Sequence, residues 1–116
     1  MKRLFVASLL AFTPLTWALD QAGTQHLGEL QQRWAQIQYQ TPKDQRADAF
    51  EKLAGDAASF VQQYPGKAEP LIWDGIINSS WAGATGGLGA LSKVKAAKAS
   101  LEQAMKLDPT ALQGSA

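Results

Sequence analysis

The residue types that carry most enzyme chemistry are scarce in this chain. Its 116 residues include a single histidine, His26, and no cysteine, so there is no second imidazole for a metal pair and no thiol nucleophile. Ser79 and Ser80 have no histidine at a suggestive distance, and the ten acidic residues are scattered without a pair suited to acid–base work. No metalloprotease, hydrolase or EF-hand motif occurs. The sequence therefore predicts no catalytic residue, no metal site, no cofactor and no enzymatic activity.

Four glycines between residues 83 and 89 invite comparison with phosphate-binding loops. The spacing lacks the last glycine of the dinucleotide-binding motif, and a helix is expected before it where that motif requires a strand. The P-loop spacing also fails, because Lys93 does not directly follow a glycine. A glycine loop before a helix can still hold an anion through free backbone N–H groups. Such a site would use Gly86, Gly87, Gly89 and Lys93, while a plain connector between helices is the simpler interpretation.

The best candidates for recognition are polar residues on an otherwise apolar segment. Asp74 and Asn78 are one helical turn apart and are expected to project together beside Trp81. In this position the three residues would bind a peptide or a small ligand. In the alternative interpretation, Asp74 pairs with a lysine of the last helix and Asn78 caps the backbone of a neighbouring helix. Both interpretations stay open. The lysines in question are Lys93, Lys95, Lys98 and Lys106.

The first 18 residues have the order of a secretory signal peptide. Lys2 and Arg3 precede an apolar run, and residues 16–18 supply small residues at a cleavage site. The alternatives are an uncleaved anchor and an ordinary first helix. Cleavage leaves nine basic residues against ten acidic ones, a near-neutral balance that argues against nucleic-acid binding and against a polybasic membrane-surface protein. We expect a periplasmic protein with no stable membrane insertion after cleavage.

Helical periodicity dominates the rest of the chain, and strand signals are absent. With 46% hydrophobic and 18% charged residues, the composition is that of a folded chain. Helices are expected at about residues 21–40 and 42–64, from 68 to 81 or 84, and at about 91–107. The apolar stripe of the last helix is expected to comprise Leu91, Val94, Ala97, Leu101, Ala104 and Met105.

Proline, glycine and capping residues mark the ends of these helices. Thr41 is expected to cap the second helix, with Pro42 at its first position and Asp44 near its positive end. The second helix should stop at residues 64–66, where a proline and then a glycine follow a tyrosine. Residues 83–89 contain too many glycines to remain helical. Because the connections are short, sequential helices should be antiparallel neighbours, which predicts an all-α protein of two helical hairpins. Trp34, Trp73 and Trp81 are expected to fill the space between the hairpins.

The last two helices resemble a tetratricopeptide (TPR) repeat. Gly75 would occupy the small position of the first helix, and Ala97, Leu101, Ala104 and Pro109 match the spacing of the second. The prolines at 65 and 109 are 44 positions apart, against about 34 in the standard repeat, and the aromatic pattern of the first helix is missing. Residues 68–76, the glycine loop and the basic last helix are together similar to exported TPR-type proteins of Gram-negative bacteria, including the TatT-type periplasmic component of TRAP transporters. A plain four-helix bundle is the competing arrangement.

The resemblance implies a TPR-like domain over residues 19–109 that works as a protein-interaction module in envelope assembly, folding or transport. Its partner would be a protein or peptide, or a transported solute, and the alternative function is a small-molecule-binding bundle. Residues 110–116 look like a tail or the start of an incomplete further repeat. Solenoids need about three or more units and a polar cap. Three alternatives stay open: the chain is a truncated form of a longer protein, a partner such as a second copy of the chain covers the C-terminal end, or the tail frays.

Overall fold

The computed structural model describes residues 19–110, and in this range it contains four α-helices and no strand. The chain is therefore an all-α protein, as the sequence predicts. The predicted signal peptide at residues 1–18 lies outside the described residues, as does most of the 110–116 tail. The helices are α2 (Gln21–Gln40), α3 (Lys43–Gln63), α4 (Ala68–Thr85) and α5 (Ala90–Leu107).

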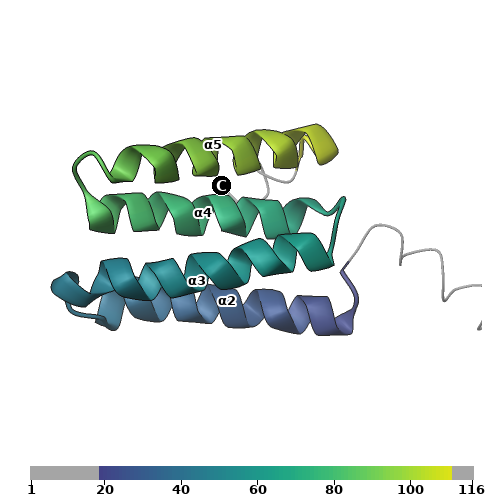
Figure 1. Cartoon of the computed structure of the whole chain (residues 1–116). Coiled ribbons are helices and arrows are strands. Elements are labelled where there is room, and N and C mark those ends of the chain that lie inside the picture. The colour runs from purple at the N-terminus through teal and green to yellow at the C-terminus, as the bar shows by residue number, and fades with distance from the viewer. Residues whose placement is uncertain (1–18, 111–116) are drawn as a thin grey trace, which may run out of the picture.

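The four helices form a layered stack of two antiparallel hairpins, with α4 in its middle (Figure 1). The backbone of α4 contacts α2, α3 and α5, whereas that of α5 approaches α4 alone among the described helices. In a closed four-helix bundle the first and last helices also meet. The packing order is therefore that of an open stack, with α5 at one edge of it.

The start of α2 is tied to the end of α3 by one carboxylate. Asp20 is the N-cap of α2, and its Oδ1 accepts a hydrogen bond of 2.6 Å from the backbone N–H of Gly23. The Tyr64 hydroxyl, at the C-terminal end of α3, donates to the same oxygen at 2.9 Å. These two hydrogen bonds hold the pKa of Asp20 below its ordinary value. Asp20 therefore caps one helix and joins two.

The predicted cap of α3 is wrong. The N-cap is Pro42 and no side chain caps the helix, because the helix begins one residue later than predicted and Thr41 instead ends α2. The Thr41 hydroxyl donates weakly to the carbonyl of Gln36, at 3.4 Å, and its own carbonyl accepts from Arg46 Nε at 2.8 Å. Asp44 lies in the first turn of α3, as predicted.

The two glycine-containing turns differ in how well the sequence placed them. α3 ends at Gln63, and Gly66 has a φ of +83°, which confirms the predicted stop. The glycine-rich turn is shorter than predicted, because α4 continues to Thr85 and includes Gly83. Within residues 83–89, φ is positive at Gly86 and Gly87, at +68° and +60°, a backbone conformation that favours glycine. A single exposed glycine inside a helix costs only about 1 kcal/mol, which the packing of α4 offsets.

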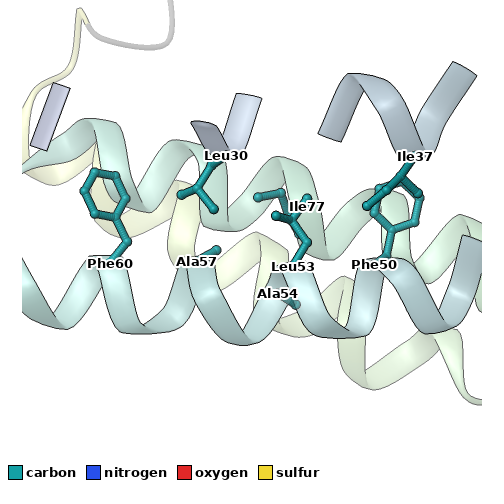
Figure 2. Packing of buried hydrophobic residues seen from close by; sticks show 8 residues of the cluster. All are labelled: Leu30, Ile37, Phe50, Leu53, Ala54, Ala57, Phe60 and Ile77. Carbon is teal, nitrogen blue, oxygen red and sulfur yellow. The ribbon is translucent and has the colours of Figure 1, made fainter. Parts of the chain in front are cut away.

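The main core lies between the first hairpin and α4 (Figure 2). Seven of its eight buried residues come from α2 and α3, and Ile77, with no exposed surface, is the contribution of α4. Trp34 and Trp81 pack against this cluster while remaining partly exposed. The tryptophans therefore cover the core instead of filling it. The cluster comprises Leu30, Ile37, Phe50, Leu53, Ala54, Ala57, Phe60 and Ile77.

The interface between α4 and α5 is built on small residues. Ala97 and Ala104 are buried, and an ideal Cβ on Gly75 would lie 2.6 Å from Leu101 Cγ. The helices can come this close only because position 75 has no side chain. The rest of the stripe predicted for the last helix is not buried: Leu91, Val94 and Met105 are each about half exposed, since no described helix lies on that side of α5.

No helix in the described range is both long and apolar enough to cross a membrane.

Candidate functional site

The structure buries Asp74 and Asn78 at the side of α4 that faces α5. Ser100 Oγ, on α5, donates a hydrogen bond of 2.6 Å to Asp74 Oδ2. Asn78 Nδ2 donates to the backbone carbonyl of Asp74, within its own helix, at 2.8 Å. The partner of Asp74 is therefore a serine of the last helix, not a lysine. Asn78 caps no neighbouring helix.

Burial raises the pKa of the Asp74 carboxyl above its ordinary value, because the charged form loses contact with water. The hydrogen bond from Ser100 acts in the opposite direction, because it favours the charged form, and it only partly offsets the effect of burial. A buried carboxylate with this partner resembles a link between two helices more than a ligand-binding group. Its role in recognition stays a prediction.

Trp81, the third predicted recognition residue, interacts with the last helix as well. Lys93 Nζ lies 4.3 Å from the centroid of a Trp81 ring, a cation–π distance. The same amine donates to the carbonyl of Gly89 at 3.1 Å. Lys93 is thus held against a carbonyl of the glycine turn and an aromatic face.

Several backbone groups of the glycine turn form hydrogen bonds within the turn or with the end of α4. Gly86 N–H donates to the carbonyl of Ala82 at 3.0 Å, and Ala90 N–H donates to the carbonyl of Gly87 at 3.2 Å. With Lys93 also engaged, Gly86, Gly87 and Gly89 have the contacts of a connector that starts α5. These contacts favour the connector interpretation, and the anion site stays a prediction.

A second group of side chains, on α2 and α4, forms an aromatic surface that sequence reasoning did not assemble. Trp34 Nε1 donates to Ser80 Oγ at 2.8 Å, and its ring meets Trp73 edge to face with centroids 5.8 Å apart. Tyr39 also meets Trp34 edge to face, with ring centroids 6.1 Å apart, and is 73% exposed. We call Trp34, Tyr39, Trp73 and Ser80 the aromatic surface. Tyr39 was missed because it falls outside the apolar stripe of α2.

A pocket of about 440 Å³ adjoins the aromatic surface through Ser80. Its lining carries two cationic side chains, Lys43 and Arg46, and no carboxylate, so we call it the basic pocket. Arg46 is oriented by its hydrogen bond to the Thr41 carbonyl, and the buried Phe50 is among the lining residues. The signal in the sequence was the pair of cations three residues apart at the start of a helix. The lining residues are Gln38, Lys43, Arg46, Phe50, Ser80, Gly83 and Ala84.

The described residues contain no group of three or more side chains suited to binding a metal ion. His26, the single imidazole of the chain, stacks at a tilt on Phe60 with ring centroids 4.5 Å apart. Every buried side-chain nitrogen or oxygen in the described range has a hydrogen-bond partner. The polar side chains of the described interior are therefore satisfied by hydrogen bonds.

Comparison of the chain with protein-family models, with curated proteins and with solved structures finds no match.

Proposed function

We propose that this protein is a non-enzymatic interaction module that binds a segment of another protein across α2, α3 and α4. The observation that carries the proposal is the continuity of the aromatic surface with the basic pocket at Ser80. Aromatic side chains provide large contact areas at low entropic cost, and tyrosine, tryptophan and arginine dominate binding energy at interfaces. Tyr39 is already exposed, so it is accessible to a partner without rearrangement.

The chemistry of the two features defines the partner class. A peptide with an apolar or aromatic side chain next to a carboxylate would place the first on Trp34 and Tyr39 and the second beside Lys43 and Arg46. Arginine favours planar, bidentate contacts with carboxylates. The near-neutral charge balance of the chain after residue 18 supports a protein partner over a nucleic acid.

The stacking order and the small residues at the α4–α5 interface support the TPR-like interpretation. In TPR-type solenoids each helical pair packs on the next and leaves an extended surface for ligands. Leu101 packs directly against the backbone of Gly75, and the small positions of a TPR repeat permit close contacts of this type. A role in envelope assembly, folding or TRAP-type transport is part of this proposal and rests on the resemblance of residues 68–109.

We also propose that the protein is exported to the periplasm and that its first 18 residues are cleaved. Cleavage after Ala18 would leave Leu19 and Asp20 in the mature chain, so α2 would keep its N-cap. Expression of the full chain in a Gram-negative host, followed by osmotic release and N-terminal sequencing, tests this step. A product that starts at Leu19 in the periplasmic fraction supports export, and an uncleaved product in the cytoplasm contradicts it.

Selection from a random peptide library displayed on phage tests the binding proposal. We expect selected peptides to combine acidic with aromatic or aliphatic residues. Tyr39→Ala and Lys43→Glu should each weaken their binding at least about tenfold, equivalent to about 1.4 kcal/mol. Lys52→Glu is the matched control, because it is an exposed lysine on the same helix and its reversal should leave affinity unchanged. Selection of no peptides, or equal loss with Lys52→Glu, would contradict the proposal.

The two cations of the basic pocket, in a lining without a carboxylate, support a second candidate function, the binding of a small anionic solute. The volume of the pocket lies in the range of about 300–1,000 Å³ that is typical of ligand pockets. Ser80 lines this pocket and accepts a hydrogen bond from Trp34. A solute bound in the pocket would therefore lie close to Trp34 and would change the fluorescence of its indole. Saturable quenching by a small carboxylate that Trp34→Phe abolishes would favour this function over peptide binding.

A further inference from the structure

The charged residues of the fold are distributed unevenly along the stack. Because sequential helices are antiparallel, the α2–α3 and α4–α5 turns lie at the same end of the molecule (Figure 1). The half of the stack at this end comprises residues 31–53 and 77–98, and it carries seven lysines and arginines against three acidic residues. The other half, within residues 19–110, carries two lysines against seven acidic residues. We call these halves the basic end and the acidic end.

The charge separation does not depend on residues near the middle of the stack. Arg33 and Asp56 form an ion pair where the two halves meet. Without this pair, the basic end still has an excess of three basic residues and the acidic end an excess of four acidic ones. A negatively charged surface would therefore attract one end and repel the other. The net charge, which argues against a membrane-surface role, does not reveal this arrangement, because it does not say which helix ends lie together.

The basic end also carries the most exposed large apolar side chains of the described chain. Leu88, in the glycine turn, is 92% exposed. Leu91 and Val94 follow it in the first turns of α5 and are 57% and 50% exposed. Tyr39, which is also exposed, lies in the last turn of α2 at the same end. Exposed apolar groups that gather beside charged ones mark interaction surfaces.

The surroundings of Leu88 favour a lipid layer over a folded protein as the partner. The residues beside it are Gly86, Gly87 and Gly89, which have no side chains, so a single apolar group extends from the turn. A protein partner would need a pocket matched to this one group. The boundary between headgroups and acyl chains of a bilayer accepts an apolar side chain at any point of its area.

Two lysines at the start of α5 are suitably placed to meet lipid headgroups. Lys95 and Lys98 are exposed, and neither forms an ion pair in the described structure. At about 100° per residue they lie on the same side of α5 as Leu91. Lysine stems lie along apolar surface while the amines stay in water or among headgroups. Residues 77–98 contain no aspartate or glutamate, so no carboxylate of this segment opposes an anionic lipid.

We propose that the basic end is a docking surface for a membrane that contains anionic lipids. Leu88 enters the interfacial layer, Lys95 and Lys98 contact lipid phosphates, and the acidic end points away from the membrane. The contact is peripheral and reversible, because it uses one turn and a few lysines. Leu88, Lys95 and Lys98 belong neither to the aromatic surface nor to the basic pocket, so the inference does not depend on the proposed function.

Co-sedimentation with lipid vesicles tests the docking. The purified chain, cleaved or not, is mixed at low salt with vesicles of phosphatidylcholine alone or with an equal part of phosphatidylglycerol. Residues 1–18, where present, contribute equally to every variant. We expect binding to the anionic vesicles that weakens at least about tenfold in about 0.5 M salt, because salt screens the charges. Lys95→Glu combined with Lys98→Glu should weaken it at least about tenfold, and Leu88→Ser about threefold.

Lys106→Glu is the matched control, because Lys106 is an exposed lysine on the same helix at the acidic end. It lies more than a Debye length of about 10 Å farther along α5 than Lys95. Its reversal should therefore leave the binding within about twofold of the original chain. Circular dichroism of each variant verifies that the helices remain folded, as expected for substitutions at exposed positions.

A fluorescent label tests the orientation of the stack on the membrane. The chain has no cysteine, so Leu88→Cys and Gln63→Cys each provide one site for an environment-sensitive fluorophore. Gln63 is exposed and ends α3 at the acidic end. We expect the emission of the label at position 88 to shift to the blue on anionic vesicles, and that of the label at position 63 to stay unchanged.

Several outcomes would overturn the assignment. These are no binding to anionic vesicles at low salt, equal binding to neutral vesicles, equal loss with Lys106→Glu, and a spectral shift at position 63 without one at position 88. Binding to polyglutamate but not to vesicles, lost on reversal of Lys95 and Lys98, would assign the basic end to an acidic protein and would also overturn it.

Discussion

At the residue scale, Asp74 shows how a polar residue on an apolar helix can act as a link. Its carboxylate is 9% exposed and accepts a short hydrogen bond from Ser100 across the α4–α5 interface. Taking a charge out of water is costly, and one hydroxyl donor does not fully offset the cost. The raised pKa of this carboxyl is the result. A neutral side chain of the same shape would keep the hydrogen bond and avoid the cost of burying a charge.

Asp74→Asn is therefore expected to raise the melting temperature by a few degrees at pH 7. The folded chain holds the Asp74 proton more tightly than the unfolded chain, whose pKa is near the ordinary 3.8. The stability that this carboxyl provides is thus fully present below that value and is lost as pH rises through the raised pKa. The advantage of the variant should shrink as pH falls through the same window. Thermal melts at a series of pH values measure it.

Ser100→Ala is the companion variant, since it removes the donor and leaves the charge. It should cost about 1.5 to 3 kcal/mol at pH 7, as the loss of a hydrogen bond to a charged group does. A melting temperature for Asp74→Asn that falls as far as that of Ser100→Ala would show that the charge itself stabilises the fold, which would contradict this prediction.

At the element scale, the packing of α5 on α4 depends on the absence of one side chain. The Cβ of an alanine at position 75 would lie 2.6 Å from Leu101 Cγ and 3.3 Å from the carbonyl oxygen of Ala97. The Leu101 side chain would have to move, and the Ala97 carbonyl belongs to the backbone of α5. The helix axes must separate to admit a methyl group, and this loosens the small-residue interface along its length.

Gly75→Ala is expected to destabilise the protein by about 1 to 3 kcal/mol, even though alanine is the better helix former by about 1 kcal/mol. Gly55→Ala is the matched control, because Gly55 is also helical and has nothing within 4 Å of its ideal Cβ. That variant should gain about 0.5 to 1 kcal/mol. Urea unfolding of both variants measures the difference. Equal stability of the two would show that α4 and α5 are not this close in solution.

At the scale of the whole molecule, the open stack gives each helix a different share of the core. α4 contacts the three other described helices, whereas α5 contacts α4 alone. The largest buried side chains lie between the first hairpin and α4, and α5 contributes only small residues to the interior. Local opening free energy follows the apolar contact that each segment buries. The edge helix is therefore expected to open more readily than α3.

Amide hydrogen exchange at low protein concentration should therefore show a gradient across the stack. The middle of α5 is expected to exchange at least about tenfold faster than the middle of α3, a difference of about 1.4 kcal/mol in opening free energy. Equal protection of α3 and α5 in dilute solution would contradict the stack as described.

Local patterns in the chain predicted most of the helical framework. Apolar spacing and turn residues act over one or two turns, so α2, the end of α3 and the span of α5 were predicted to within a residue or two. The cap of α3 and the glycine turn were predicted less well. Local signals compete there: Thr41 both ends one helix and precedes the next, and Gly83 is tolerated because the packing of α4 offsets its low propensity.

The arrangement of the helices in space decided which residues are buried, which pair and which stay free. Leu91, Val94 and Met105 look like core residues along the chain, yet they are exposed because no described helix lies beside them. Asp74 accepts a hydrogen bond from Ser100, and Trp34 donates one to Ser80, which is 46 positions away in the chain. The period of a helix defines its faces from local order alone, whereas the neighbour of each face depends on contacts between segments that the chain order leaves open.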